Sequence, residues 1–104
     1  MTIKNKKTLN TVIIIPARID SSRLKKKLLR NISGLPMIVR VAQNAENLKM
    51  GRVIVGTDSR EIYNECEKNN LEAMMTKSSH KSGTDRVYEV YKILNKDFDL
   101  IINL

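Results

Sequence analysis

The feature that most constrains this chain is a run of four β-branched residues, Val12 to Ile15, close to its start. Such a run predicts a strand that is buried on both faces, as strands are in a parallel sheet covered by helices. It is far too short for a membrane span or for the apolar core of a signal peptide. After Pro16 and Ala17 the chain turns strongly basic. We therefore expect a buried strand that opens directly into a positively charged loop.

Apolar runs of strand length alternate with helical patterns along the rest of the chain, without repeats or low-complexity linkers. This alternation predicts consecutive βα units and hence a parallel α/β sheet. At 104 residues the chain forms one domain at most, and we expect a cytoplasmic protein. The expected strands are Val12 to Ile15, Arg52 to Gly56, Glu72 to Met75 and Leu100 to Leu104.

Three helices are expected between these strands. The first begins at Pro36, whose fixed φ suits the first helical position, and it carries one apolar face. That face consists of Ile38, Val41, Ala42, Ala45 and Leu48. The other two helices begin with capping boxes, formed by Asp58 with Glu61 and by Ser82 with Asp85. The third helix turns Val87, Val90, Tyr91 and Leu94 toward the sheet.

The single cysteine, Cys66, excludes an internal disulfide. It shares the inner side of the second helix with Ile62. We expect it to be a core residue and not a nucleophile, because nothing in the pattern implies an electropositive environment around it.

The net charge of +8 is concentrated at one end of the chain. Residues 1–30 hold nine basic residues and one acid, whereas residues 31–104 are balanced. Part of the excess belongs to a polar leader, residues 1–10, which we expect to be a solvated end. Because the remainder is neutral and lacks interleaved aromatic residues, we expect neither a nucleic-acid nor a membrane partner.

The rest of the excess lies in the loop from Pro16 to Asn31. Its cations are Arg18, Arg23, Lys25, Lys26, Lys27 and Arg30. Ligands of parallel sheets bind at the carboxyl ends of the strands, so a compact polyanion such as a triphosphate would suit this cluster. A lysine-rich loop that is merely solvated explains the same composition. The loop matches neither the P-loop nor the GxGxxG pattern.

Four stretches then carry a family resemblance: PARIDSSRLKKKLL, ISGLPMIVRV, VGTD and HKSGTDR. In this order they resemble the N-terminal part of the 3-deoxy-manno-octulosonate cytidylyltransferases, which open with PAR and RLPGKPL elements and carry a more specific HxSGT[DE]R element. The resemblance runs from about Thr11 to the last residue. It implies a three-layer α/β/α, Rossmann-like nucleotidyltransferase fold with parallel strands. Residues 1–104 would be the incomplete N-terminal part of one such domain.

The resemblance also implies a reaction. CMP would pass from CTP to 3-deoxy-D-manno-octulosonate (Kdo) with release of pyrophosphate and the help of Mg²⁺, for lipopolysaccharide biosynthesis. Carried over by motif position, Arg18 would contact the phosphates, and Lys27 would hold them while charge builds on pyrophosphate; these are the catalytic candidates. The nucleotide-binding candidates are Ala17, Arg18, Ser22, Arg23, Lys27, Ser82, Gly83 and Thr84.

Some candidates have two interpretations. The serine at position 82 with Asp85 is explained by helix capping as well as by nucleotide binding. Asp58 could hold a metal, although helix capping is the favoured role. His80 could donate to a substrate or could be an exposed polar residue, and one histidine makes no metal site.

The chain departs from the family in two respects, and both limit the activity that we expect of it. Lys25 to Leu29 reads KKKLL where the family has PGKPL, so the turn that shapes the loop is altered. In the family, a strand like Leu100 to Leu104 runs into a QGDEP motif whose aspartate binds the metal, and the later half supplies Kdo recognition, a second metal-binding aspartate and the dimer surface. We therefore expect no metal ligand in this chain and no unaided turnover. The complete enzyme would be a homodimer, or a C-terminal chain would complement this one. The alternative is a catalytically inactive nucleotide- or polyanion-binding remnant.

Overall fold

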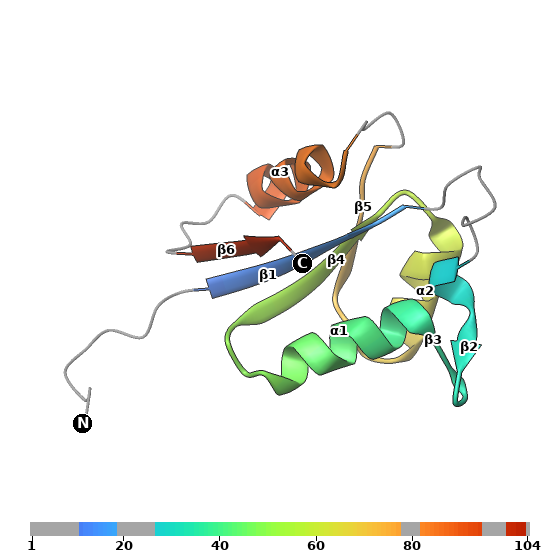
Figure 1. Cartoon of the computed structure of the whole chain (residues 1–104). Coiled ribbons are helices and arrows are strands. Elements are labelled where there is room, and N and C mark those ends of the chain that lie inside the picture. The colour runs from blue at the N-terminus through green and yellow to red at the C-terminus, as the bar shows by residue number, and fades with distance from the viewer. Residues whose placement is uncertain (1–10, 19–26, 78–81, 95–99, 104) are drawn as a thin grey trace, which may run out of the picture.

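A computed structural model describes residues 11–18, 27–77, 82–94 and 100–103 of the chain. Its elements follow one another as repeated strand and helix units (Figure 1). In chain order they are β1 (Thr11–Ala17), the 3-10 helix η1 (Lys27–Leu29), β2 (Asn31–Ile32), β3 (Leu35–Pro36), α1 (Met37–Asn47), β4 (Arg52–Thr57), α2 (Arg60–Lys68), β5 (Ala73–Met75), α3 (Gly83–Leu94) and β6 (Leu100–Asn103).

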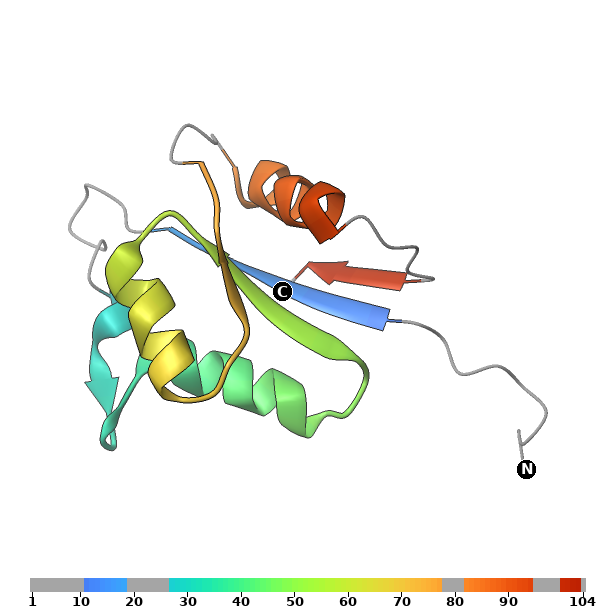
Figure 2. The ribbon, with the colours of Figure 1, turned by 180° about the vertical axis from the view of Figure 1, so that it is seen from behind.

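The main sheet contains four parallel strands in the order β5, β4, β1, β6. Helices α1 and α2 cover one face and α3 covers the other, which gives three layers (Figures 1 and 2). Counted along the chain, the order of the parallel strands is third, second, first, fourth, as at the start of a Rossmann sheet. The expected Rossmann-like α/β fold is therefore confirmed.

Strand β1 lies between two apolar layers, as its β-branched run predicts. Ile13, Ile15 and Ala17 point into the cluster under α1 and α2. Val12 and Ile14 point into the cluster under α3. Alternate residues of a strand face opposite sides, so only a strand covered on both faces buries all of them.

Helix α1 begins at Met37, with Pro36 as its N-cap residue, one position later than expected. Its buried face includes the expected Ile38 and also Val39. Leu48, expected on this face, is 61% exposed. The helix ends at Asn47, and Lys49 has a positive φ of 54°, so the chain turns away before Leu48 reaches the core.

The two capping predictions have different outcomes. Helix α3 begins as expected, because the backbone N–H of Asp85 donates to Ser82 Oγ at 3.2 Å. Helix α2 is capped by Ser59 and not by Asp58: the N–H of Ile62 donates to Ser59 Oγ at 3.2 Å. Strand β4 extends through Thr57, one residue beyond the expected end, and this shifts the start of the helix by one residue.

A two-stranded hairpin formed by β2 and β3 precedes α1 and was not expected. Its turn residues, Ser33 and Gly34, both have positive φ, 53° and 93°. Two such residues in a row form the two-residue turn that matches the twist of a hairpin. Among the described residues, no helix is long and apolar enough to cross a membrane.

Candidate functional site

Three chain segments leave the sheet side by side at its carboxyl edge. The register pairs Ala17 with Thr57 and Thr57 with Met75, so β1, β4 and β5 end in one row. Strand β6 lies on the other side of β1 from β4, which makes the β1 and β6 boundary the point where the strand order reverses. Open parallel sheets bind their ligands beyond the carboxyl ends of the strands at such a point.

The basic loop begins at this edge. Ala17 is buried at the end of β1, and Arg18, the next residue, is exposed. Lys27 is the first residue of η1, where the described chain resumes. Ser22 and Arg23, with Lys25 and Lys26, lie outside the described residues. Arg18 is thus placed at the carboxyl edge of β1, and the phosphate-binding roles remain predictions.

The N-terminus of α3 lies against the end of β1. A Cβ atom on Gly83 would stand 3.2 Å from Pro16 Cγ, tighter than an ordinary carbon contact, so glycine permits this approach. The exposed Ser82 and Thr84 flank Gly83 at the same end of the helix. Free backbone N–H groups of a helix N-terminus favour anions. The structure therefore brings the described part of the HKSGTDR motif to the PAR motif; His80 itself lies outside the described residues.

Arg86, the last residue of that motif, is a functional candidate that the sequence analysis missed. It is only 1% exposed. Its Nη1 donates to Thr76 Oγ1 and to the carbonyl oxygen of Lys77, the latter at 3.0 Å. Its Nη2 lies 3.8 Å from Asp58 Oδ2. One signal in the sequence could have indicated its burial: Arg86 directly precedes Val87, which faces the sheet from α3.

Asp58 therefore lies next to Arg86, a neighbour that the sequence analysis did not expect. It lies directly after β4, where its carboxylate faces the guanidinium of Arg86. The capping role belongs to Ser59 and not to Asp58, and a metal-ligand role for Asp58 stays a prediction. In the part of the chain that the structure describes, no group of three or more His, Cys, Asp or Glu side chains could hold a metal ion.

Helix α3 approaches the sheet closely because residue 56 is a glycine. A Cβ on Gly56 would stand 2.6 Å from Val90 Cγ2, a distance that real Cβ contacts do not show. The same Cβ would lie 3.8 Å from Arg86 Cγ. Because Gly56 has no side chain, α3 can pack closely on β4. This close packing brings Arg86 to the carboxyl ends of β4 and β5.

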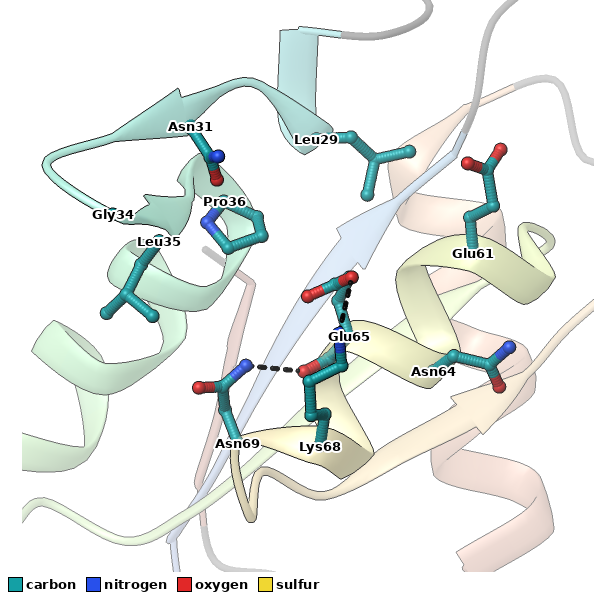
Figure 3. A pocket seen from close by; sticks show the side chains of 10 residues that line it. All are labelled: Leu29, Asn31, Gly34, Leu35, Pro36, Glu61, Asn64, Glu65, Lys68 and Asn69. Carbon is teal, nitrogen blue, oxygen red and sulfur yellow. Dashed lines mark hydrogen bonds and ion pairs between the residues drawn. The ribbon is translucent and has the colours of Figure 1, made fainter.

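Two other features lie apart from these residues. A pocket of about 750 Å³ opens between the β2–β3 hairpin, the end of η1 and α2, and contains none of the predicted site residues (Figure 3). Cys66 is fully buried on the inner side of α2, and burial raises the pKa of its thiol to about 11. A thiol with this pKa stays protonated at neutral pH, which agrees with the expected core role.

The strand order and the site at its reversal define an open, parallel α/β protein of the Rossmann-like class. Comparison with known families narrows this class, because the family profile described as Cytidylyltransferase matches residues 12–104. The chain belongs to this cytidylyltransferase family.

Individual relatives agree with the motif resemblance. The chain is 44% identical over 99 residues to the 3-deoxy-manno-octulosonate cytidylyltransferase of Brucella anthropi, a match that covers 93% of this chain and 40% of that protein. It is 47% identical over 90 residues to the enzyme of the same name from Herminiimonas arsenicoxydans, covering 86% and 36%. The resemblance to the N-terminal part of this group is confirmed.

A solved structure supports the same conclusion for the fold. It is a CMP:2-keto-3-deoxy-manno-octonic acid synthetase complexed with CTP, which superimposes with a TM-score of 0.82 at 40% identity. The match covers 91% of this chain and 39% of that structure. The chain therefore spans about two fifths of the length of the relatives it matches.

Proposed function

We propose that this protein binds CTP at the carboxyl edge of its sheet and serves the transfer of CMP to Kdo with release of pyrophosphate. The observation that carries this proposal is the contact of the α3 N-terminus with the end of β1, through Gly83 and Pro16. It brings two of the four stretches that carry the family resemblance, the PAR and HKSGTDR motifs, to one location. The CTP held by the solved relative and the names of the sequence relatives support the same ligand and acceptor.

The residues divide between the two sides of this location. On the β1 side, Arg18, Ser22, Arg23 and Lys27 would bind the triphosphate, together with the backbone at Ala17. On the α3 side, Ser82, Gly83 and Thr84 would bind the nucleotide through a helix N-terminus. Positioning and charge neutralisation are the main contributions that such a site makes to nucleotidyl transfer.

In the proposed reaction the anomeric hydroxyl of Kdo attacks the α-phosphorus of CTP. A new oxygen to phosphorus bond forms as the hydroxyl releases its proton to water, and the bond from the α-phosphorus to the bridging oxygen of the β-phosphate breaks, with its electron pair leaving on pyrophosphate. Negative charge then grows on the departing pyrophosphate, next to Arg18 and Lys27. Mg²⁺ belongs to the proposal through the resemblance alone, because the described residues offer it no cluster of ligands and we assign none to it.

The concentration of positive charge favours a second candidate. Nine basic residues within the first thirty could bind any compact polyanion without catalysis. This alternative predicts binding that ignores the base and weakens steeply with salt.

Calorimetric titration of the 104-residue chain distinguishes the two candidates. We expect saturable binding of CTP in the presence of Mg²⁺ that exceeds the binding of ATP and pyrophosphate. The Lys27→Ala variant should raise the Kd for CTP about tenfold or more, since a charged hydrogen bond contributes about 1.5–3 kcal/mol. Lys68→Ala, at an exposed lysine on α2, is the matched control and should stay within about twofold. Equal binding of all polyanions would support the alternative.

The transfer step is tested by a graft. Residues 12–104 would replace the matching segment of the Brucella anthropi relative, and formation of CMP-Kdo would be measured. We expect the graft to be active and its Lys27→Ala variant to lose activity by orders of magnitude. A folded but inactive graft that still binds CTP would contradict the proposed transfer and leave the binding function intact.

A further inference from the structure

We propose that Asp58 recognises the nucleoside part of the nucleotide, because its carboxylate accepts a hydrogen bond from a donor of that nucleoside. The inference rests on the proposed function and deepens it, since it names a residue that distinguishes the nucleoside of CTP from others. The donor is the 4-amino group of cytosine or a hydroxyl group of the ribose. Ligands that lack one or the other tell these two sources apart.

Asp58 lies in the middle of the carboxyl edge of the sheet. The register places the ends of β1, β4 and β5 in one row, with β4 in the middle. Arg18 follows β1, Asp58 follows β4 and Thr76 follows β5. Open parallel sheets bind their ligands across this edge, so a nucleotide whose phosphates lie at Arg18 has Asp58 as a near neighbour.

The backbone at Asp58 is fixed by the residues on both sides of it. The N–H of Ser59 donates to Thr57 Oγ1 at 3.0 Å, and Ser59 Oγ accepts from the N–H of Ile62 at 3.2 Å. The carbonyl oxygen of Thr57 accepts from the N–H of Thr76 at 2.8 Å, which ties the end of β4 to the end of β5. A carboxylate on such a fixed backbone has a defined direction, as a recognition group requires.

Arg86 holds the carboxylate from the side of α3. Its Nη2 lies 3.8 Å from Asp58 Oδ2, while its Nη1 donates to Thr76 Oγ1 and to the carbonyl oxygen of Lys77. The side chain of Arg86 is 1% exposed and that of Asp58 is 11% exposed. The arginine is thus enclosed by the protein, whereas the carboxylate keeps a part that a ligand can reach.

The charge of Asp58 determines which part of a nucleotide can lie against it. A carboxylate repels phosphate, so the triphosphate belongs on the basic β1 side, at Arg18. An ionised carboxylate is an acceptor only and can accept about four hydrogen bonds, so its pairing with Arg86 leaves capacity for a ligand. The nucleoside supplies N–H and O–H donors that match this capacity.

A purely structural ion pair explains these features less well. The distance of 3.8 Å between Arg86 Nη2 and Asp58 Oδ2 is too long for a direct hydrogen bond. Among the described residues, Nη2 has no hydrogen-bond partner. A buried ion pair is weak evidence for stability, because well-packed apolar side chains often serve the fold equally well. The pair is better explained by the carboxylate that it presents at the ligand-binding edge.

The test compares triphosphates that differ in the nucleoside. UTP has a carbonyl oxygen in place of the 4-amino group, and 2′,3′-dideoxy-CTP lacks both ribose hydroxyls. Their Kd values and that of CTP would be measured by calorimetry with Mg²⁺ on the wild-type chain and on Asp58→Ala. We expect the wild-type chain to bind at least one analogue about tenfold more weakly than CTP. The Asp58→Ala variant should bind that analogue and CTP with Kd values within about twofold of each other.

Glu61→Ala is the matched control, because it removes an exposed carboxylate from the first turn of α2. It should leave both Kd ratios within about twofold of their wild-type values. Asp58→Glu provides a second test, since it keeps the charge beside Arg86 and displaces the carboxylate. It should reduce the same ratio even if Asp58→Ala fails to fold. A merely structural role would lower the melting temperature of both Asp58 variants and leave their Kd ratios unchanged, and that result would overturn the inference.

The outcomes also separate this inference from the proposed function. A wild-type chain that binds CTP no better than pyrophosphate would overturn both. A wild-type chain that prefers CTP to pyrophosphate, but binds both analogues as tightly as CTP or keeps its discrimination in the Asp58 variants, would overturn the role of Asp58 alone.

Discussion

The two faces of the sheet are built from different kinds of side chain. The face under α1 and α2 is an apolar layer that includes Ile38, Ala42, Ile62 and Cys66. The face under α3 has a smaller apolar cluster, and the fully buried Arg86 belongs to the same helix. Both helix layers pack on β1, β4 and β5, so the difference lies in what each layer does for the molecule.

The comparison separates stability from positioning. Burial of apolar surface stabilises a fold without requiring particular directions, whereas hydrogen bonds from a buried guanidinium stabilise only one arrangement of their partners. We therefore expect substitutions under α1 and α2 to act on the free energy of unfolding. Substitutions around Arg86 should also disturb the contacts that join α3 to the ends of β4 and β5.

The largest effect on stability is expected from Ile62→Ala. Ile62 is fully buried on the inner side of α2, and such a truncation costs about 2–5 kcal/mol through lost burial and the cavity left behind. Urea unfolding followed by circular dichroism measures this loss. Ile93→Ala on α3, where the side chain is 54% exposed, should change the free energy of unfolding by about 0.5 kcal/mol or less. Equal losses in the two variants would show that Ile62 does not contribute the buried packing described for it.

An intermediate effect is expected from Gly56→Ala on the α3 face. The new methyl group would overlap Val90 Cγ2, and overpacking of this kind costs about 1–3 kcal/mol. The double variant Gly56→Ala with Val90→Ala removes the clashing atom and should unfold at a higher urea concentration than additivity predicts. Strict additivity in this cycle would show that α3 does not sit on β4 as closely as described.

The smallest effect is expected at the helix caps, where Ser59 and Ser82 can be compared directly. Replacement of a capping serine by alanine costs about 1 kcal/mol on average. Ser59 is buried and Ser82 is exposed, so water can replace the lost bond only at Ser82. Ser59→Ala should therefore lower the urea midpoint more than Ser82→Ala, and the reverse order would contradict this explanation.

Much of the fold could be predicted because its signals are local. The run from Val12 to Ile15 predicts a strand buried on both faces, and Ser82 with Asp85 predicts the start of α3; the structure confirms both. The prediction was wrong for Leu48 because the end of a helix depends on where the chain must turn. It was wrong for Asp58 because β4 is one residue longer than its apolar pattern indicates.

The candidate site was predictable only in part. Its motifs, from Ala17 and Arg18 to Ser82 through Thr84, are visible in the sequence, and the basic loop is visible in the charge distribution. Arg86 belongs to one of these motifs, but its burial does not follow from its residue type, since an arginine on a helix is usually exposed. The pattern of neighbouring apolar residues showed which way the helix faces, and the arginine was the exception on that face.

By itself, the sequence determined the order of the strands and helices along the chain, the two-sided burial of β1 and the cap of α3, because periodicity, β-branching and capping act between residues that are near one another in the chain. Only the tertiary structure decided that β1 lies between β4 and β6, that Gly83 rests on Pro16, and that Arg86 reaches Lys77 and Asp58. Those contacts depend on which strands become neighbours and how closely α3 approaches them. Both are set by the packing of the whole sheet and its helices, to which no local pattern corresponds.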